Sequence, residues 1–182
     1  MIATSVPWRV KIEQCDAGDV DAIFALYEHA VRLQHEKGAT PWPVFDRGLV
    51  TTEISEGRQW KIVVDGHPRC VWGVAYNDPL IWGERDADPA IYIHRIATDP
   101  AYRGRGFVKD IVEWSRRFAA ARGRRYVRLD TVGNNTGLIS HYTRCGFAFL
   151  GLTRLENTAG LPSHYHHATV SLFELDLGAS RS

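Results

Sequence analysis

The sequence has few cysteines, no long apolar run and almost no net charge, and each of these deficits excludes a class of protein. Its three cysteines, Cys15, Cys70 and Cys145, lie far apart without a C-x-x-C pair, which argues against a disulfide framework or a zinc site. No apolar run approaches the ~18–20 residues that span a bilayer, and the first residues lack the zones of a secretory signal. The net charge of +1 gives no general attraction to nucleic acid or membranes. We therefore predict a cytoplasmic protein that uses no metal and binds neither nucleic acid nor membrane.

The length and composition suit one folded domain. The 182 residues are 45% hydrophobic and 24% charged, which is the ordinary balance of a globular protein, and the chain is long enough to bury one substantial core. No internal repeat or low-complexity stretch interrupts it, so we predict a single domain over residues 1–182. Because the net charge is so small, any site for an anion has to be created locally.

Hydrophobic periodicity predicts strands and helices in succession. Alternation of apolar and polar residues indicates strands, and apolar residues at helical spacing indicate helices. Asp65-Gly66 between two apolar runs predicts a hairpin, whereas the prolines on either side of Trp42 require a loop. The expected strands are 8–14, 60–64, 70–76, 90–98, 126–132, 148–152 and 165–177. The expected helices run from Asp16 or Asp19 to Gly38, from Asp46 to Glu56, from beyond Gly106 to about Arg122, and from Thr136 to Cys145, with a long polar loop over 77–89.

The order of these elements indicates the fold class. Strands come first as a meander and then in a β-α-β-α-β succession, which predicts a mixed α/β domain with about seven strands.

A glycine-rich turn between a strand and a helix is the most informative segment. The strand ending at Thr98 is followed by Arg103-Gly104-Arg105-Gly106, and a long amphipathic helix begins at once. Glycines let successive N–H groups point into one concavity, and a helix N-terminus adds partial positive charge. Together they can bind a pyrophosphate without a metal. The glycines could equally serve only to allow a tight turn.

Two familiar phosphate-binding loops are excluded by the residues at this turn. No lysine-serine or lysine-threonine pair follows the glycines, so the turn is not a P-loop. The third glycine of a dinucleotide-binding motif would fall on Lys109, and no suitable acidic strand end follows.

Arg103-Gly104-Arg105-Gly106 after Ile96-Ala97-Thr98 resembles the acetyl-CoA motif of GNAT acetyltransferases, Q/R-x-x-G-x-G/A. The resemblance implies a GNAT-like, mostly antiparallel sheet with about four flanking helices, and acetyl-CoA as cosubstrate. In that family the turn binds the CoA pyrophosphate and the preceding strand pairs with the pantetheine arm. The implied contacts are Ile96, Ala97 and Thr98 for pantetheine, and Arg103, Gly104, Arg105, Gly106, Phe107 and Val108 for pyrophosphate. The Q/R position is Ala101 here, which removes a side-chain contact but leaves a main-chain cradle.

A second segment resembles the same family. Asn135 precedes Tyr142 by seven residues, and Cys145-Gly146-Phe147 follow. In the family the asparagine lies near the CoA arm and the tyrosine lies close to the thioester sulfur. The resemblance therefore implies that Asn135 contacts the cosubstrate and that Tyr142 is the general acid that protonates the departing thiolate. A packing role for the Tyr142 ring stays open.

Acylation of an amine also requires a group that removes its proton, because most amines are protonated at pH 7. His94 is the best candidate for this base, since it lies on the strand expected to line the acceptor pocket and its ordinary pKa near 6.5 suits the task. A histidine hydrogen-bonded within the sheet is an equal alternative. Tyr92 and Asp130 are weaker candidates, and a water-mediated route needs no single base.

Several other residues fit either a functional role or a purely structural one. Strand alternation would align His164 with His166, but a third metal ligand is not evident and a polar strand face is the simpler reading. Trp42 and Trp82 fit either an aromatic-lined acceptor pocket or packing in the core or a homodimer. Cys145 occupies an apolar position before Gly-Phe and is expected in the core rather than as an acyl-carrying nucleophile.

These residues predict an acyl-CoA-dependent N-acyltransferase that transfers acetyl directly to a primary amine of a small molecule. The alternative is a catalytically silent acyl-CoA-binding sensor or partner module. The presence of Tyr142 favours the enzyme, whereas the missing Q/R residue leaves the alternative open.

Overall fold

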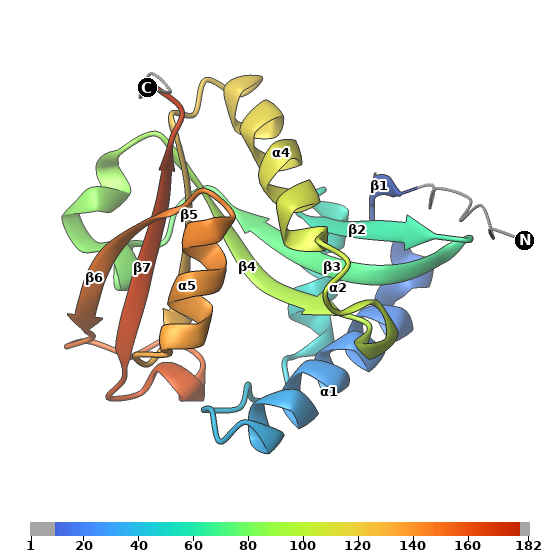
Figure 1. Ribbon diagram of the computed structural model, residues 1–182, viewed down its shortest axis with the longest axis horizontal. Helices are drawn as coiled ribbons and strands as arrows, with labels where there is room; N and C mark the ends of the chain where they lie inside the picture. Colours follow the sequence, from blue (N-terminus) through green and yellow to red (C-terminus); the bar gives the residue numbers. More distant parts are fainter. Residues whose placement is uncertain (1–9, 179–182) are drawn as a thin grey trace, which may run out of the picture.

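The computed structural model describes residues 10–178, and its centre is a seven-stranded sheet in the order β1-β2-β3-β4-β5-β7-β6 (Figure 1). The strands are β1 (Lys11–Gln14), β2 (Gln59–Val64), β3 (His67–Ala75), β4 (Ala90–Thr98), β5 (Tyr126–Val132), β6 (Ala148–Arg154) and β7 (Thr169–Asp176). The helices are α1 (Val20–Glu36), α2 (Arg47–Ser55), α3 (Pro79–Trp82), α4 (Phe107–Ala120) and α5 (Thr136–Arg144). Among the described residues only β4 and β5 pair in parallel, so the predicted mixed, mostly antiparallel sheet is confirmed.

The β2–β3 hairpin follows the local prediction. Val64 pairs with His67, so Asp65 and Gly66 form a two-residue turn. Both turn residues have positive φ, 51° and 78°, as a type I′ turn requires, and glycine and aspartate tolerate that conformation. The turn sets the register of the two strands and therefore the face on which each side chain lies.

The two faces of the sheet carry different helices. Side chains of α4 and α5 pack with Trp72, Ile91 and Phe173 on one face, the face turned to the viewer in Figure 1. Residues of α1 and α2 pack with Val71 and Ala97 on the opposite face. Neighbouring residues of a strand point to opposite faces, which is why Val71 and Trp72 belong to different clusters.

Pairing between β4 and β5 is short, and this gives the sheet its main irregularity. Within residues 10–178 the parallel pairing ends at Tyr92 and Arg128, while β4 continues along β3 and β5 continues along β7. A bulge in β4 adds one residue between His94 and Ala97 relative to β3, and Arg95 has a φ of 52°. Bulges bend a strand and redirect its side chains, so β4 turns away from β5 beyond this point.

Several element boundaries differ from the sequence prediction; β3 begins at His67 rather than at Cys70, and β6 ends at Arg154 rather than at Leu152. The segment 77–89, expected as a polar loop, contains α3 and a 3-10 turn (Gly83–Ala87), because Pro79 can occupy the first turn of a helix. The last strand begins at Thr169 rather than at residue 165, since Ser163–Tyr165 form a 3-10 turn. The first strand was expected from Trp8, which lies outside the described residues, and is observed from Lys11. Among residues 10–178, no helix has the length and apolar character needed to cross a membrane.

Candidate functional site

The glycine turn after β4 presents unpaired backbone donors. Gly104 and Gly106 have φ values of 77° and 84°, which strain residues with a side chain, and α4 begins immediately at Phe107. Among the described residues, no hydrogen-bond acceptor faces the N–H groups of Gly104, Gly106, Phe107 or Val108. These donors and the positive end of the α4 dipole suit a phosphate anion. The geometry of the turn is compatible with the predicted cradle, whose binding of a pyrophosphate stays a prediction.

The turn is held in place by Asp99, the residue that follows β4. The Asp99 carboxylate accepts a hydrogen bond from the Ala101 amide at 2.9 Å and pairs with Arg69 of β3 at 2.9 Å. The Arg69 guanidinium in turn lies 4.9 Å from the Tyr102 ring centroid. These contacts join the turn to the sheet, so its donors do not depend on a flexible loop for their position.

The predicted pantetheine strand has one paired edge and one free edge. Ala97 and Thr98 pair with Val71 and Cys70 of β3, and the Thr98 hydroxyl donates to the Cys70 sulfur at 3.3 Å. No backbone pairing with β5 is found beyond Tyr92 in the part of the chain that the structure describes. Backbone groups on that edge of Ile96 to Thr98 are consequently available to a ligand.

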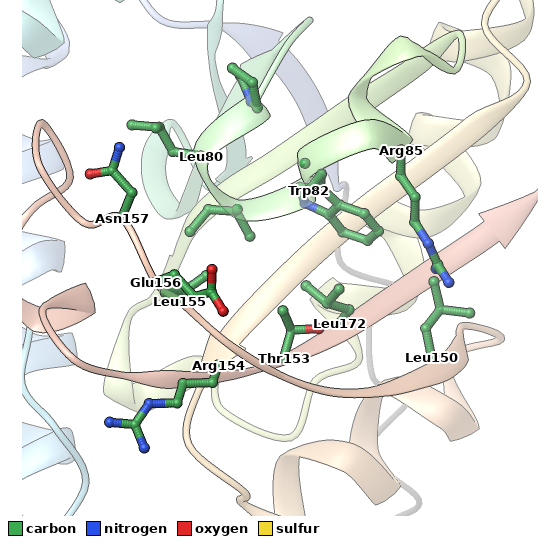
Figure 2. Close-up of a pocket in the computed structure, with 13 residues that line it drawn as sticks. Leu80, Trp82, Arg85, Leu150, Thr153, Arg154, Leu155, Glu156, Asn157 and Leu172 are labelled. Atoms are coloured by element: carbon green, nitrogen blue, oxygen red, sulfur yellow. The ribbon is translucent and has the colours of Figure 1, made fainter.

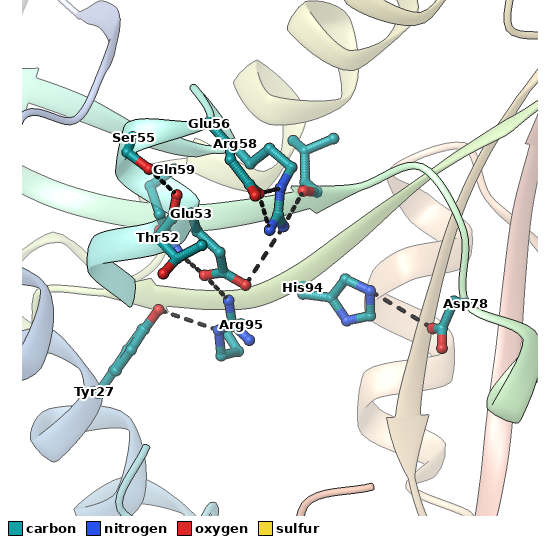
Figure 3. A network of polar contacts seen from close by, with 11 residues as sticks. Tyr27, Thr52, Glu53, Ser55, Glu56, Arg58, Gln59, Asp78, His94 and Arg95 are labelled. Carbon is teal, nitrogen blue, oxygen red and sulfur yellow. Dashed lines mark hydrogen bonds and ion pairs between the residues drawn. The ribbon is translucent and has the colours of Figure 1, made fainter. Parts of the chain in front are cut away.

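A buried polar network stabilises the bulge of β4 (Figure 3). Arg95 donates to Glu53 of α2 at 2.5 Å and to the Tyr27 hydroxyl of α1 at 3.2 Å. Glu53 also accepts from Gln59 at 2.6 Å and lies 3.6 Å from Arg58. The ion pair and hydrogen bonds offset both the burial of the charges and the positive φ of Arg95. The sequence analysis missed this network, since its members are distant in the chain.

His94 precedes the bulge and points toward Asp78 (Figure 3). Its Nε2 atom lies 3.6 Å from Asp78 Oδ2, and the two side chains are 25% and 12% exposed. Burial lowers the pKa of His94 to about 3, with contributions from the charges of Arg95 and Arg58. At pH 7 His94 is therefore neutral, so one of its two ring nitrogens carries no proton and can accept a hydrogen bond.

Asp78 and Asp130 both have raised pKa values. Burial raises the pKa of Asp78 to about 8, and the charges of Asp130 and Asp86 contribute. Burial raises the pKa of Asp130 to about 6, although the hydrogen bond that it accepts from the Tyr165 hydroxyl at 2.9 Å opposes the shift. One ligand-type atom from each of Asp78, His94 and Asp130 lies within 4.8 Å of the others. Only His94 and Asp130 of this group were singled out from the sequence.

Tyr142 of α5 packs against the core cluster on the face of the sheet that α4 and α5 cover. Its ring packs 5.2 Å from the Phe173 ring and 5.9 Å from the Phe147 ring, yet its hydroxyl has no hydrogen-bond partner among the described residues. Burial raises the pKa of Tyr142 above its ordinary value, and the charges of Cys145, Cys70 and Asp130 contribute. The hydroxyl therefore keeps its proton at neutral pH and can donate it.

The remaining predicted residues have structural positions. Asn135 caps α5 by accepting a hydrogen bond from the Leu138 amide at 3.1 Å. Trp42 packs against Tyr27 and Phe45, and Trp82 is 4% exposed against Tyr92. These contacts favour the packing alternative for both tryptophans.

The histidines near residue 165 do not lie on a strand, so the predicted alternation of His164 and His166 is wrong. His164 lies in the 3-10 turn Ser163–Tyr165, and His166 follows it. The His164 ring lies 6.4 Å from the Phe45 ring, which brings the β6–β7 connection against the loop after α1. Cys145 follows α5 and packs against the main core, as expected.

Two cavities lie away from these residues. One of about 390 Å³ is formed between α3 and β6 by residues that include Leu80, Trp82, Leu150 and Leu155 (Figure 2). Another of about 430 Å³ lies between β1 and α4. Trp82, a candidate for the acceptor pocket, lines the first cavity, but neither cavity is lined by a predicted catalytic or acetyl-CoA-binding residue, so the divergence of β4 and β5 remains the candidate site.

Comparison with known proteins agrees with this geometry. Residues 43–147, more than half of the chain, match the family model described as the acetyltransferase (GNAT) family. The chain is 23% identical over 141 residues to YesJ, an uncharacterized N-acetyltransferase of Bacillus subtilis (strain 168), which covers 73% of this chain and 78% of YesJ.

Solved structures share the fold. A GNAT-family acetyltransferase of Listeria monocytogenes 4b F2365 superposes with a TM-score of 0.74 at 20% identity, over 92% of this chain and 94% of that one. The YncA protein of Salmonella typhimurium, solved with its cofactor acetyl-CoA, superposes with a TM-score of 0.68 at 14% identity, over 95% and 96% of the two chains.

Proposed function

This chain belongs to the GNAT acetyltransferase family and is an acetyl-CoA-dependent acetyltransferase, and from that premise we propose that it acetylates a primary amine of a small molecule directly. The observation that carries the proposal is the succession of a free β4 edge, a turn with four unpartnered amides and a protonated Tyr142 hydroxyl. Acetyl-CoA needs all three, because its phosphates must be bound, its pantetheine arm must be aligned and its departing thiolate must be protonated.

We assign the binding of acetyl-CoA to the backbone of this region. The amides of Gly104, Gly106, Phe107 and Val108 hold the pyrophosphate, while Arg103 and Arg105 add positive charge. Ile96, Ala97 and Thr98 hold the pantetheine arm through the edge that β5 leaves unpaired. Asn135 acts on this arm through α5, whose first turn its side chain caps. Holding both substrates in one orientation supplies much of the acceleration in a direct transfer.

The transfer also needs two proton movements. When the amine nitrogen bonds to the acetyl carbon of acetyl-CoA, the carbon–sulfur bond breaks and the sulfur takes a proton. Tyr142 supplies that proton, since its raised pKa keeps the hydroxyl protonated, and the proton that the nitrogen loses on forming the amide passes through water to restore the hydroxyl. His94 is neutral at pH 7 and can accept a hydrogen bond from the amine, but a pKa lowered to about 3 makes it a weaker proton acceptor than the ordinary imidazole expected from the sequence.

The surroundings of His94 support a small acceptor. Its side chain is 25% exposed and that of Asp78 is 12% exposed, and the contact between Phe45 and His164 joins two loops near this face. A small amine fits this restricted access.

A screen of primary amines with acetyl-CoA tests the proposal. Free thiol release would be measured for small amines and for peptides with free N-termini, and acetylated product would be identified by mass. We expect product from at least one small amine, with activity lost in Tyr142→Phe while acetyl-CoA still raises the melting temperature. Acetyl-CoA binding without transfer to any amine would instead favour the silent acyl-CoA-binding module.

A further inference from the structure

Three elements bring Asp78, His94 and Asp130 together. Asp78 precedes α3, His94 lies on β4 and Asp130 lies on β5, and one polar atom of each lies within 4.8 Å of the other two. The Oδ2 atom of Asp78 is buried and has no hydrogen-bond partner among the described residues. The Nε2 atom of neutral His94 lies 3.6 Å from this oxygen, which is too long for a hydrogen bond.

The nearby cations are engaged elsewhere. Arg95 pairs with Glu53, Arg58 pairs with Glu53 and Glu56, and Arg128 pairs with Asp88 and Glu174. Within residues 10–178, neither Asp78 nor Asp130 forms an ion pair with a lysine or an arginine. Two carboxyl groups are therefore buried near each other without the positive charge that ordinarily accompanies them.

The other groups around Asp78 do not supply that charge. Asp86, from the 3-10 turn after α3, accepts a hydrogen bond from the Asp78 amide at 2.6 Å and is itself acidic. Tyr165, from the β6–β7 connection, donates to Asp130 and is neutral. Asp86 and Tyr165 thus add no positive charge beside Asp78, and the arginines whose charges act on His94 are paired with Glu53 and Glu56, so a cation entering here would relieve an unbalanced negative site.

We infer that Asp78 and Asp130 bind the ammonium form of the acceptor amine beside His94, and that Asp78 keeps the proton which the amine loses. This inference rests on the proposed function and specifies its substrate class, a primary amine that is a cation at pH 7. An ammonium group has three donors, which match the two carboxylates and the His94 ring nitrogen.

The proton balance is simple. Binding of the ammonium ion favours the ionised carboxylates, so the proton that Asp78 carries in the free protein at pH 7 is released to water. The bound R–NH₃⁺ then transfers one proton to the Asp78 carboxylate, which leaves a neutral R–NH₂ and a neutral carboxyl group. The burial that raises the pKa of Asp78 to about 8 in the free protein makes its carboxylate a stronger base than an exposed aspartate, which favours this transfer. After the amide product leaves, Asp78 keeps this proton, which restores the free protein, and releases it to water when the next ammonium ion binds.

The test compares charged and uncharged acceptors of similar shape. Benzylamine, butylamine and 1,4-diaminobutane are cations at pH 7, whereas aniline and its ring-substituted relatives are not. Acetyl transfer from acetyl-CoA would be measured for the whole chain and for Asp78→Asn and Asp130→Asn, which remove charge at nearly constant volume. Asp21→Asn is the matched control, because its side chain is 91% exposed on α1 and outside the cluster. Stabilisation by acetyl-CoA verifies that each variant is folded.

We expect the ammonium substrates to be preferred, and the KM for them to rise about tenfold to a hundredfold in each cluster variant with no change in Asp21→Asn. The rise of kcat/KM with pH should flatten in Asp78→Asn. Calorimetry in buffers of different ionisation enthalpy should show proton release when a charged amine binds at pH 7.

Distinct results overturn distinct statements. Efficient transfer to aniline, with ammonium substrates unaffected by both cluster substitutions, would refute the ammonium site while leaving the acetyltransferase proposal intact. Ammonium binding with proton release but no acetyl transfer to any amine would refute the proposed function and leave the ammonium site supported. Loss of activity with EDTA and recovery with Zn²⁺ would show that the cluster binds a metal and would overturn the inference.

Discussion

Replacing Asp78 with asparagine should change how the stability of the protein depends on pH. The change removes an ionisable group at a side chain that is 12% exposed and keeps its size. The pKa of Asp78 rises from 3.8 to about 8 in the folded protein, and that of His94 falls from 6.5 to about 3. The two groups are adjacent, so their titrations are best treated together.

The protons held by the pair set the slope. Between pH 3.8 and 6.5 the folded pair is a neutral acid beside a neutral imidazole, whereas the unfolded chain has an ionised aspartate and a protonated histidine. Both states hold one proton, so this pair gives no slope there. Between pH 6.5 and 8 the folded pair still holds one proton and the unfolded chain holds none, so stability falls as the pH rises.

The magnitude follows from the width of that window. A pH interval of about 1.5 at about 1.36 kcal/mol per pH unit gives a loss of about 2 kcal/mol between pH 6.5 and 8. Asp78→Asn should lack this loss, because the raised-pKa group is gone. On the acid side the variant should instead lose stability as the pH falls below 6.5, because the lowered pKa of His94 is no longer balanced by Asp78.

Urea unfolding at pH 5, 6.5 and 8.5, followed by tryptophan fluorescence, would measure the changes in stability on the acid and on the alkaline side of pH 6.5. The comparison of wild type with Asp78→Asn cancels the contribution of every other titrating group, and Asp21→Asn shows the effect of removing an exposed carboxylate. Parallel stability curves for wild type and Asp78→Asn from pH 5 to 8.5 would refute the charge states assigned to this pair.

Three further predictions concern binding, catalysis and the bulge of β4. Millimolar acetyl-CoA should raise the melting temperature of the wild type but not of Gly104→Val, in which a side chain at φ 77° distorts the turn. Gly123→Val, at φ 64° beyond the end of α4, is its matched control, and equal acetyl-CoA affinity in both variants would mean that the cradle is misplaced. Tyr142→Phe and His94→Gln should each lower kcat by about 100- to 10,000-fold with little effect on acetyl-CoA affinity, whereas near-normal turnover of both would make these residues structural. Glu53→Ala should lower the free energy of unfolding by about 3–5 kcal/mol, because it leaves the Arg95 charge buried and unpaired, and a loss below about 1 kcal/mol in urea titrations would contradict that account.

The sequence by itself determined the features that depend on neighbours along the chain. The spans of β4 and β5 were predicted to the residue, because runs of β-branched and aromatic side chains between turn residues leave little choice. The Asp65-Gly66 hairpin and the turn at Gly104 and Gly106 follow from the few residues that tolerate positive φ. Family membership was likewise readable, since the glycine turn and the Tyr142 segment are local motifs.

Only the tertiary structure decided which polar groups meet. Asp78 was assigned to a long polar loop, and it approaches His94 where α3, whose Trp82 is buried against Tyr92, lies beside the divergence of β4 from β5. The bulge at Arg95 depends on Glu53, a residue of α2 that no local pattern connects to it. Sequence spacing cannot predict such meetings, because burial and long-range electrostatics arise only when distant segments pack together. For the same reason, the pKa of His94 had to be assumed ordinary until its burial was known.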